Sequence, residues 1–279
     1  MESKHPTYTI VNDPKEADAV GWGFYEQDVK KIQKIYFKFP PLKSDEIRIN
    51  ITYTGLCHSQ VHYVAGDWNR WVKNVPIIPG HEMVGEVTHV GSDVKDFKIG
   101  DKVGFGCFRD YCGSCKKCLR GDDNLCRSSD QNLTYGDLYW GGFATAMQQP
   151  AKMFFKLPEN LPEEAAAPLF CPGITAFTPV DKYCKPGYEV AVAGIGGVGH
   201  MAVQYAKAYG CRVTVFTTSK GKEDLFKKLG ADRVVITTEE GVFQKEAGKY
   251  DVLINNLPYA NAEMFNNYSS LLEDRKSVV

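Results

Sequence analysis

Residues 188–210 read YEVAVAGIGGVGHMAVQYAKAYG, and they indicate how the second half of the chain folds. An apolar run typical of a buried strand leads through a glycine-rich turn into a segment with helical periodicity. Between a strand and a helix, Gly-x-Gly-x-x-Gly indicates a dinucleotide loop, because glycines permit a tight turn and let a diphosphate reach the amides at the helix start. The alternative is a glycine-rich turn that binds nothing. We expect cofactor contacts at Gly194, Gly196, Gly197, Val198 and Gly199.

The sequence around this loop predicts two domains. Strands are expected at 188–193, 212–216, 233–236 and 251–254, residues 276–279 could start a fifth, and helical segments lie between them. Such alternation predicts a parallel sheet with helices on both faces. The stretch from residue 162 to residue 183 reads as helix. Earlier residues form short apolar or alternating runs between Gly, Pro and Asp turns, which suits a small β-barrel-like domain. We expect domains at 1–160 and 161–279.

Composition excludes several classes of protein. Apolar residues make up 43% and charged residues 24% of the 279 positions, as in ordinary soluble globular proteins. A formal net charge of −1 gives no broad attraction to nucleic acid or to an anionic membrane, and we expect neither as a partner. There is no apolar run of about 18 residues and no secretory signal, so a cytoplasmic protein is expected.

Nine cysteines are the unusual feature of the composition. Their odd number and the lack of an export signal argue against a disulfide framework. Four of them fall within residues 112–126, and thiolates at such spacing can turn onto one tetrahedral zinc ion with no open position, which predicts a structural site. The alternatives are free thiols, a nucleic-acid-binding zinc ribbon, which normally has widely separated Cys-x2-Cys pairs, and an iron–sulfur cluster, which spacing alone does not distinguish. The expected ligands are Cys112, Cys115, Cys118 and Cys126.

A second set of metal ligands comes from three separate segments: GLCHSQVH (55–62), PGHEMVGEV (79–87) and LFCPGIT (169–175). Taken singly, a cysteine is usually a buried apolar residue and a histidine a satisfied polar one. Together they offer two thiolates, an imidazole and a neighbouring carboxylate, the composition of a catalytic zinc site with room for water or substrate. Zinc there acts as a Lewis acid. The predicted ligands are Cys57, His81, Glu82 and Cys171.

Ser59 and His62 follow Cys57 closely and suggest a proton relay. An alcohol that loses its proton in a shielded site needs a hydroxyl beside it and a partly exposed histidine to pass the proton to water. A turn or capping serine and a surface histidine explain the same residues equally well. From the residues alone the two interpretations are balanced.

The end of the second strand of the parallel sheet bears on the choice of cofactor. Sites for NAD usually place an acidic residue about 20 residues after the loop, where it binds the ribose 2′-hydroxyl. No carboxylate is present at this turn, and hydroxyl and lysine side chains there favour the 2′-phosphate of NADP(H). A polar helix cap that lacks an acid is the alternative. The residues concerned are Thr217, Thr218, Ser219, Lys220 and Lys222.

These segments, with VPIIPGHEMVGEV (75–87), CGSCKKCLRGDDNLC (112–126) and FTTSKGKEDLFKKLGAD (216–232), match a known family over nearly the whole chain. The chain resembles the zinc-containing medium-chain dehydrogenases, specifically their cinnamyl alcohol dehydrogenase-like, NADP-dependent branch. The resemblance implies a GroES-like β-barrel catalytic domain and a Rossmann-type doubly wound sheet. It also implies two zinc ions per chain, one catalytic and one structural, and interconversion of primary alcohols and aldehydes by hydride transfer with NADP(H).

The resemblance also implies roles for single residues. Cys57, His81 and Cys171 match catalytic zinc ligands, with Glu82 as a fourth or exchangeable ligand, and the four cysteines of residues 112–126 match the structural site. The proton relay of the family corresponds to Ser59 and His62. His58 matches a residue near the cofactor diphosphate.

In the family the cofactor sheet has six strands, and the chain then returns to complete the first domain. Because this sequence stops at residue 279, we expect its sheet and its cofactor site to be incomplete at the C-terminal end. The homodimer of the family is in doubt for the same reason. The first hypothesis is an active enzyme whose substrates are small-molecule alcohols and aldehydes. The alternative is a truncated, inactive paralogue or isoform that still binds zinc.

Overall fold

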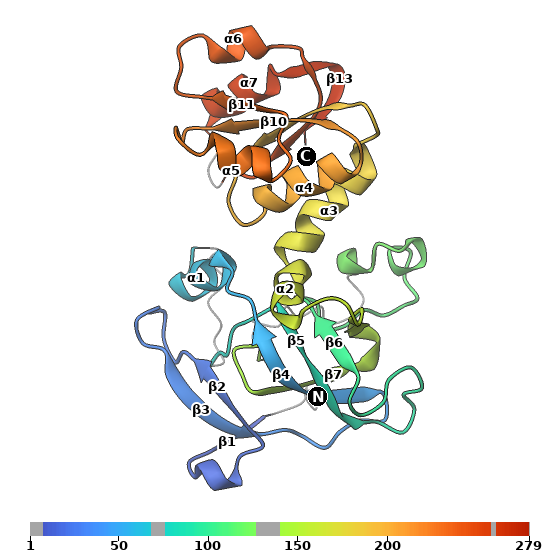
Figure 1. The fold of residues 1–279 in the computed structure, drawn as a ribbon. Helices are drawn as coiled ribbons and strands as arrows, with labels where there is room; N and C mark the ends of the chain where they lie inside the picture. Colours follow the sequence, from blue (N-terminus) through green and yellow to red (C-terminus); the bar gives the residue numbers. More distant parts are fainter. Residues whose placement is uncertain (1–7, 68–75, 127–139, 258–260, 279) are drawn as a thin grey trace. The chain divides into compact units, whose positions relative to one another are not determined.

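The computed structural model describes residues 8–67, 76–126, 140–257 and 261–278. The chain divides into two compact units, residues 1–171 and residues 172–279, which we call unit 1 and unit 2 (Figure 1). Among the described residues, no helix combines the length and the apolar character needed to span a bilayer.

Unit 1 contains two antiparallel sheets. The smaller sheet has the strand order β1 (Thr9–Val11), β3 (Gln33–Lys38), β2 (Ala19–Gly23). The larger sheet has the order β7 (Ala146–Pro150), β4 (Glu46–Thr54), β5 (Met83–Val90), β6 (Lys102–Phe105), β8 (Phe155–Lys156). The helical elements of unit 1 are α1 (His58–Ala65), α2 (Glu163–Ala166), η1 (Pro14–Glu16), η2 (Cys118–Arg120), η3 (Asp123–Leu125), η4 (Ala151–Met153) and η5 (Ala167–Phe170).

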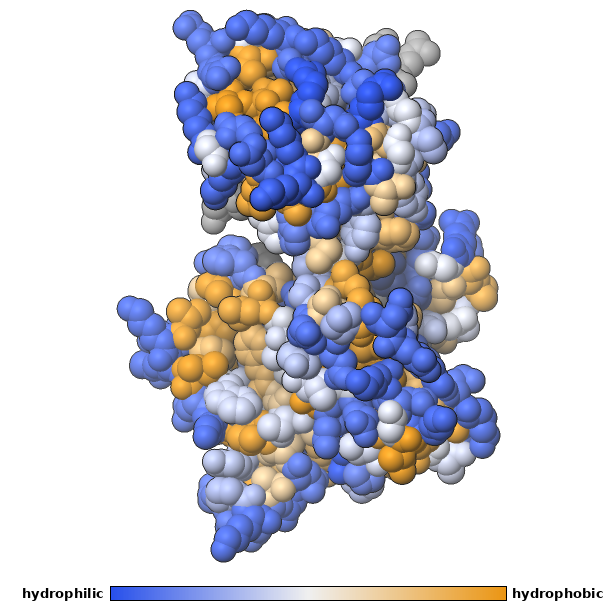
Figure 2. Space-filling model, viewed as in Figure 1, coloured by the Kyte–Doolittle hydropathy of each residue, from blue (hydrophilic) through white to orange (hydrophobic). Residues whose placement is uncertain are grey.

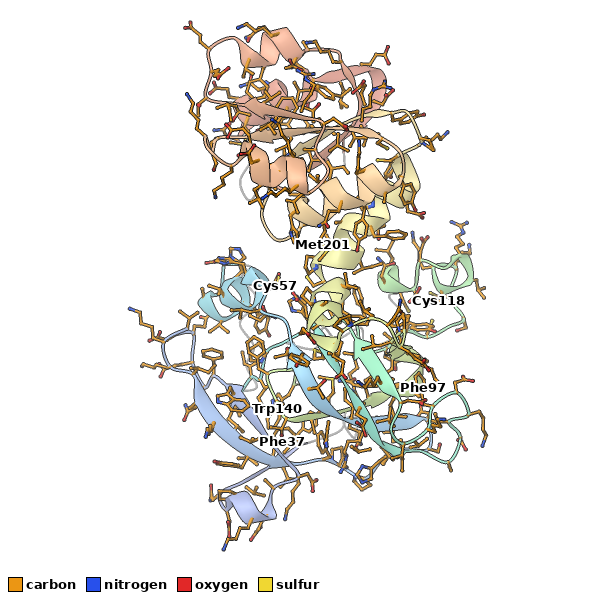
Figure 3. All side chains as sticks on the ribbon, in the orientation of Figure 1. Phe37, Cys57, Phe97, Cys118, Trp140 and Met201 are labelled. Carbon is orange, nitrogen blue, oxygen red and sulfur yellow. The ribbon has the colours of Figure 1, made fainter. Side chains whose placement is uncertain are left out.

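The packing of unit 1 follows the alternation along its strands. Ile47 and Ile49 of β4 are fully buried and pack against apolar side chains of β5, β6 and β7. A separate aromatic cluster covers the smaller sheet, where the rings of Phe37 and Trp140 meet edge to face at 4.9 Å (Figure 3). The indole N–H of Trp140 donates to the carbonyl of Pro76 at 2.9 Å, which satisfies the polar atom of this side chain.

Unit 2 is a parallel five-stranded sheet with the order β11 (Arg233–Ile236), β10 (Arg212–Thr217), β9 (Glu189–Ala193), β12 (Tyr250–Asn255), β13 (Leu272–Val278). Its helices are α3 (Pro172–Tyr183), α4 (Gly199–Ala208), α5 (Glu223–Lys228), α6 (Val242–Glu246) and α7 (Ala262–Ser269). The direction of strand addition reverses between β9 and β12, and a doubly wound sheet binds ligands at the carboxyl end of such a switch point.

Strand β9 shows how the sheet builds two cores. Val190 and Val192 point into the core formed with α3, α4 and α5, whereas Ala191 and Ala193 point into the opposite core with α6 and α7. Both faces are buried, which explains why β9 is an uninterrupted apolar run after Glu189. The predicted parallel sheet with helices on both faces is confirmed.

The segment expected to be one helix over residues 162–183 is instead three helical pieces, α2, η5 and α3. The chain departs from helical geometry at Cys171, where φ is −131° and ψ is −80°. Proline disfavours the helical conformation in the residue before it, and Pro172 follows directly. The break matters because it falls on a predicted metal ligand.

Candidate metal centres and dinucleotide site

The four cysteines of residues 112–126 converge on one point of unit 1, and their ligand atoms all lie within 4.8 Å of one another. The Sγ atoms of Cys112 and Cys118 are 3.8 Å apart, and those of Cys112 and Cys126 are 3.5 Å apart. Tetrahedral zinc–sulfur bonds of about 2.3 Å put ligand sulfurs about 3.8 Å apart. The set therefore fits a closed four-thiolate zinc site, and we call residues 112–126 the zinc lobe (Figure 3).

Backbone groups of the zinc lobe favour thiolate at this point. The amide of Cys115 donates to the sulfur of Cys112 at 3.3 Å, and the amide of Cys112 donates to that of Cys126 at 3.5 Å. Hydrogen bonds from the amides of Ser114 and Cys115 lower the pKa of Cys112 to about 7. Because metals bind the deprotonated sulfur, this backbone geometry prepares the lobe for a cation.

The second predicted set also converges, with its ligand atoms within 4.8 Å of one another. Cys57 precedes α1, His81 and Glu82 precede β5, and Cys171 lies between η5 and α3. The Sγ atoms of Cys57 and Cys171 are 3.8 Å apart, and Nε2 of His81 is 3.9 Å from a carboxylate oxygen of Glu82. Both His81 and Glu82 are buried, at 3% and 2% exposed. The structure thus brings together all four residues that the sequence proposed.

Strand geometry explains why Cys57 reaches this point. The pairing of β4 with β5 shifts register twice, and such irregularities bend a strand and re-aim its end. Beyond β4, the amide of Gly55 donates to the carbonyl of Glu82 at 2.8 Å, which ties this loop to the start of β5. A Cβ atom at residue 55 would overlap the Glu82 carboxylate, so only glycine allows this close approach.

The ionisable groups of this cluster influence one another strongly. A hydrogen bond with Cys171 lowers the pKa of Cys57 to about 3, and the same contact raises the pKa of Cys171 well above its ordinary value. Burial raises the pKa of Glu82 to about 7. The site therefore gathers potential anions in a poorly solvated place, an arrangement that a divalent cation neutralises.

The predicted relay residues lie on α1. The Ser59 hydroxyl is 3.3 Å from the sulfur of Cys57. Nδ1 of His62 lies 2.7 Å from a carboxylate oxygen of Asp67, and the ring of His58 meets the ring of His62 edge to face at 4.6 Å. The sequence reasoning missed Asp67. A signal was available, because Gly66 ends α1 with a left-handed φ of 80° and turns the next residue back toward His62.

Gln60 is a second residue that the sequence reasoning missed. Its side chain is 3% exposed and lies between two members of the metal cluster. Its Oε1 accepts the amide hydrogen of Cys57 at 2.9 Å, and its Nε2 is 2.8 Å from Nδ1 of His81. Its sequence spacing gave no signal, because the contact with His81 joins α1 to a different segment.

The glycines of the loop in unit 2 have two different structural roles. Gly194 has a φ of 78°, and a Cβ atom at Gly199 would overlap the carbonyl oxygen of Gly194, so these two permit the turn and the close packing of α4. Gly196 and Gly197 have nothing within 4 Å of their Cβ positions and are exposed. The open space lies where a diphosphate would approach the amides.

A pocket of about 290 Å³ adjoins this loop at the carboxyl end of the sheet. Among the described residues, its lining contains hydroxyl, amide and lysine side chains and no acidic one. Of the predicted cofactor residues, Gly197, Val198, Gly199 and Lys220 are outside the lining, and His58 belongs to unit 1. The predicted residues that line the pocket are Gly194, Gly196, Thr217, Thr218, Ser219 and Lys222.

Two further residues of this pocket region escaped the sequence reasoning. Nδ1 of His200 lies 3.0 Å from the carbonyl oxygen of Gly196, a contact that holds the loop. Asn256, at the end of β12, lines the pocket, and its Nδ2 is buried without a hydrogen-bond partner among the described residues. A buried donor left unpaired is costly, so this amide points to a missing acceptor beside the glycine loop.

Comparison with known proteins agrees with both halves of the chain. Residues 43–159 match the alcohol dehydrogenase GroES-like domain, and residues 197–279 match the zinc-binding dehydrogenase domain. A cinnamyl alcohol dehydrogenase from Sorghum bicolor superposes with a TM-score of 0.85 and 32% identity, over 93% of this chain and 75% of that one. CAD from Helicobacter pylori, complexed with NADP(H), superposes with a TM-score of 0.81 and 29% identity, over 93% of this chain and 74% of that one.

Curated sequences give the same result. Alcohol dehydrogenase 9 of Catharanthus roseus is 39% identical over 78% of this chain and 62% of its own length. NADP-dependent alcohol dehydrogenase C 1 of Mycolicibacterium smegmatis is 39% identical over 76% of this chain and 62% of its own length. The chain spans 60% to 65% of the length of the curated relatives described. The predicted GroES-like and Rossmann-type architecture is confirmed, and the chain belongs to the zinc-binding medium-chain alcohol dehydrogenase family.

Proposed function

We propose that this chain is a zinc-dependent oxidoreductase that interconverts primary alcohols and aldehydes with NADP(H). The observation that carries the proposal is the convergence of Cys57, His81, Glu82 and Cys171 on one buried point of unit 1. These four residues would hold the catalytic zinc, with Glu82 as the exchangeable ligand. When bound there, zinc supplies Lewis-acid activation of the substrate oxygen.

Proton movement falls to residues of α1 and the turn after it. We assign the first step to the Ser59 hydroxyl, which lies beside the sulfur of Cys57. His62 then exchanges the proton with water. Its side chain is 27% exposed, so the ring is mostly shielded but still reaches the surface. Asp67 orients this ring through the 2.7 Å contact at Nδ1.

Cofactor binding falls to unit 2. The open amides at Gly196 and Gly197 would receive the diphosphate, and the polar turn from Thr217 to Lys222 would receive the 2′-phosphate. The buried Nδ2 of Asn256 supports a ligand with an oxygen acceptor at the switch point. The contact expected for His58 and the cytoplasmic location remain predictions, and so does the expectation that the homodimer of the family need not form.

The test is NADPH oxidation by the purified chain with a series of aliphatic and aromatic aldehydes, before and after chelation and zinc re-addition. We expect turnover that disappears with the metal and returns with it. Absence of zinc-dependent turnover with every aldehyde would refute the proposal. Two zinc ions per chain together with no NADPH binding would instead support the inactive zinc-binding protein.

A further inference from the structure

Gln60 connects two of the residues proposed to hold the catalytic metal. Its carbonyl oxygen accepts from the amide of Cys57 at 2.9 Å, and its amide nitrogen lies 2.8 Å from Nδ1 of His81. The side chain is 3% exposed, so water does not replace either partner. Any role of Gln60 toward a metal rests on the proposed zinc site at Cys57, His81 and Cys171.

Without a metal, both ends of the Gln60 carboxamide have complementary partners. The oxygen faces a backbone N–H, and the NH₂ group faces Nδ1, which accepts when the ring proton of His81 is on Nε2. Nε2 is the nitrogen that faces the cluster, 3.9 Å from Glu82. The geometry therefore satisfies the metal-free protein.

Metal binding changes this balance with no change in the charge of the imidazole. A cation held by Nε2 uses the lone pair of that nitrogen, so the ring proton must move to Nδ1. Gln60 then faces two donors, the Cys57 amide and the His81 Nδ1–H, with one acceptor oxygen. Rotating the carboxamide by half a turn only exchanges the donor that is left unpaired.

From this conflict we infer that Gln60 is a positioning residue that weakens the catalytic metal site by opposing the ring tautomer that the metal requires. A side chain of the same length that only accepts hydrogen bonds would pair with both donors. Gln60→Glu should therefore bind metal at this site about tenfold more tightly, the effect of relieving one unpaired buried donor.

Cobalt titration of the full-length chain tests the inference, because the absorption of Co²⁺ separates the site with two sulfurs and one nitrogen from the four-sulfur lobe. The lobe serves as an internal reference and should keep its affinity. Val61→Glu is the matched control, since Val61 is 37% exposed on the same helix and a carboxylate there adds the same charge to α1. Its affinity should stay within about twofold of the wild type.

An unchanged or weaker affinity in Gln60→Glu overturns the inference, and so does an equal gain in Val61→Glu. Two metals in the wild type with no gain in Gln60→Glu rejects the role of Gln60 alone. One metal in both proteins rejects the proposed catalytic site as well. A second metal that appears only in Gln60→Glu supports the inference.

Ring-nitrogen NMR of the wild type gives a readout that needs no variant. The chain has six histidines, so the His81 signals can be resolved. We expect the Nε2–H tautomer in the metal-free protein and the Nδ1–H tautomer after zinc is added. A protonated Nδ1 already present in the metal-free protein would overturn the inference.

Discussion

Cys57 and Cys171 are separated by 114 positions in the sequence, yet their sulfur atoms lie 3.8 Å apart. Each is fixed by its own segment: Cys57 by the bent end of β4 and the start of α1, Cys171 by the helix break before Pro172. The contact between the two sulfurs therefore depends on the folded structure of unit 1. Replacing one of these cysteines should remove the catalytic metal ion and leave the structural ion in place.

Cys171→Ser should lower the zinc content from two ions per chain to one and reduce aldehyde reduction by more than about a hundredfold, because even outer partners of metal ligands are worth about 10 to 100-fold. Elemental analysis and NADPH-oxidation kinetics measure the two effects. Cys184→Ser, at a buried thiol of unit 2, is the control and should retain both ions. Full zinc content in Cys171→Ser would contradict the assignment of this ligand.

Removing a ligand of the zinc lobe should have a different outcome. Cys115→Ser leaves three thiolates, so we expect loss of the structural ion, rapid proteolysis within residues 112–126 and retention of the catalytic ion. Zinc content and limited proteolysis followed by mass spectrometry report this. Retained protection of the lobe in the zinc-depleted variant would argue that the thiols pack without a metal.

The cofactor pocket predicts a difference between two neighbouring lysines. Lys222 lines the pocket and Lys220 does not. Lys222→Ala should weaken NADPH binding about tenfold through loss of a charge-assisted hydrogen bond, and NADH binding should be unaffected. Lys220→Ala should have a smaller effect. Fluorescence titration with both cofactors checks this, and equal losses for NADH and NADPH would show that Lys222 does not meet a 2′-phosphate.

Asp101 gives a stability prediction with a defined pH dependence. Its carboxylate pairs with Lys156 at 2.9 Å, and this hydrogen bond lowers the pKa of Asp101 below its ordinary value of 3.8. A lowered folded-state pKa stabilises the protein above pH 3.8, and this contribution disappears as the pH falls through the folded-state value. Asp101→Asn should thus lower the free energy of unfolding at pH 7 by about 1 kcal/mol.

Urea denaturation of both proteins between pH 7 and pH 3 measures this difference. The curves of wild type and Asp101→Asn should converge toward the acidic end. A constant gap over the whole range would mean that the variant acts through packing rather than through the charge of Asp101.

The sequence alone predicted the elements whose signal is local. The first four strands of unit 2 along the chain, β9 to β12, lie within one residue of their predicted limits at each end, because they are largely apolar runs that end at clear turns. The zinc lobe followed from cysteine spacing within fifteen residues. The four ligands of the second cluster followed from their chemical types, and the structure supplied their convergence.

What the sequence could not predict depends on contacts between distant segments. Nothing near Gln60 indicates that it faces His81, since the contact arises only when α1 packs beside the start of β5. Asn256 likewise could not be singled out from the sequence, because it is 57 positions from Gly199 in the chain and lies beside the glycine loop only in the folded structure. The sequence did not predict the division of residues 162–183 into separate helices, because the residues on both sides of Cys171 have a helical composition and Pro172 was given too little weight.

The zinc lobe exposes apolar side chains that a hydrophobic core would have buried. Leu119 is 74% exposed and Leu125 is 49% exposed, whereas Cys126 is buried (Figure 2 shows the hydropathy of this face of the molecule). Because sulfur ligands on a metal ion replace an apolar interior, the fraction of the zinc lobe that is folded depends on the concentration of free zinc. Above its dissociation constant, each tenfold rise in free zinc adds about 1.4 kcal/mol to the folded lobe, so its stability follows the zinc supply of the surrounding solution.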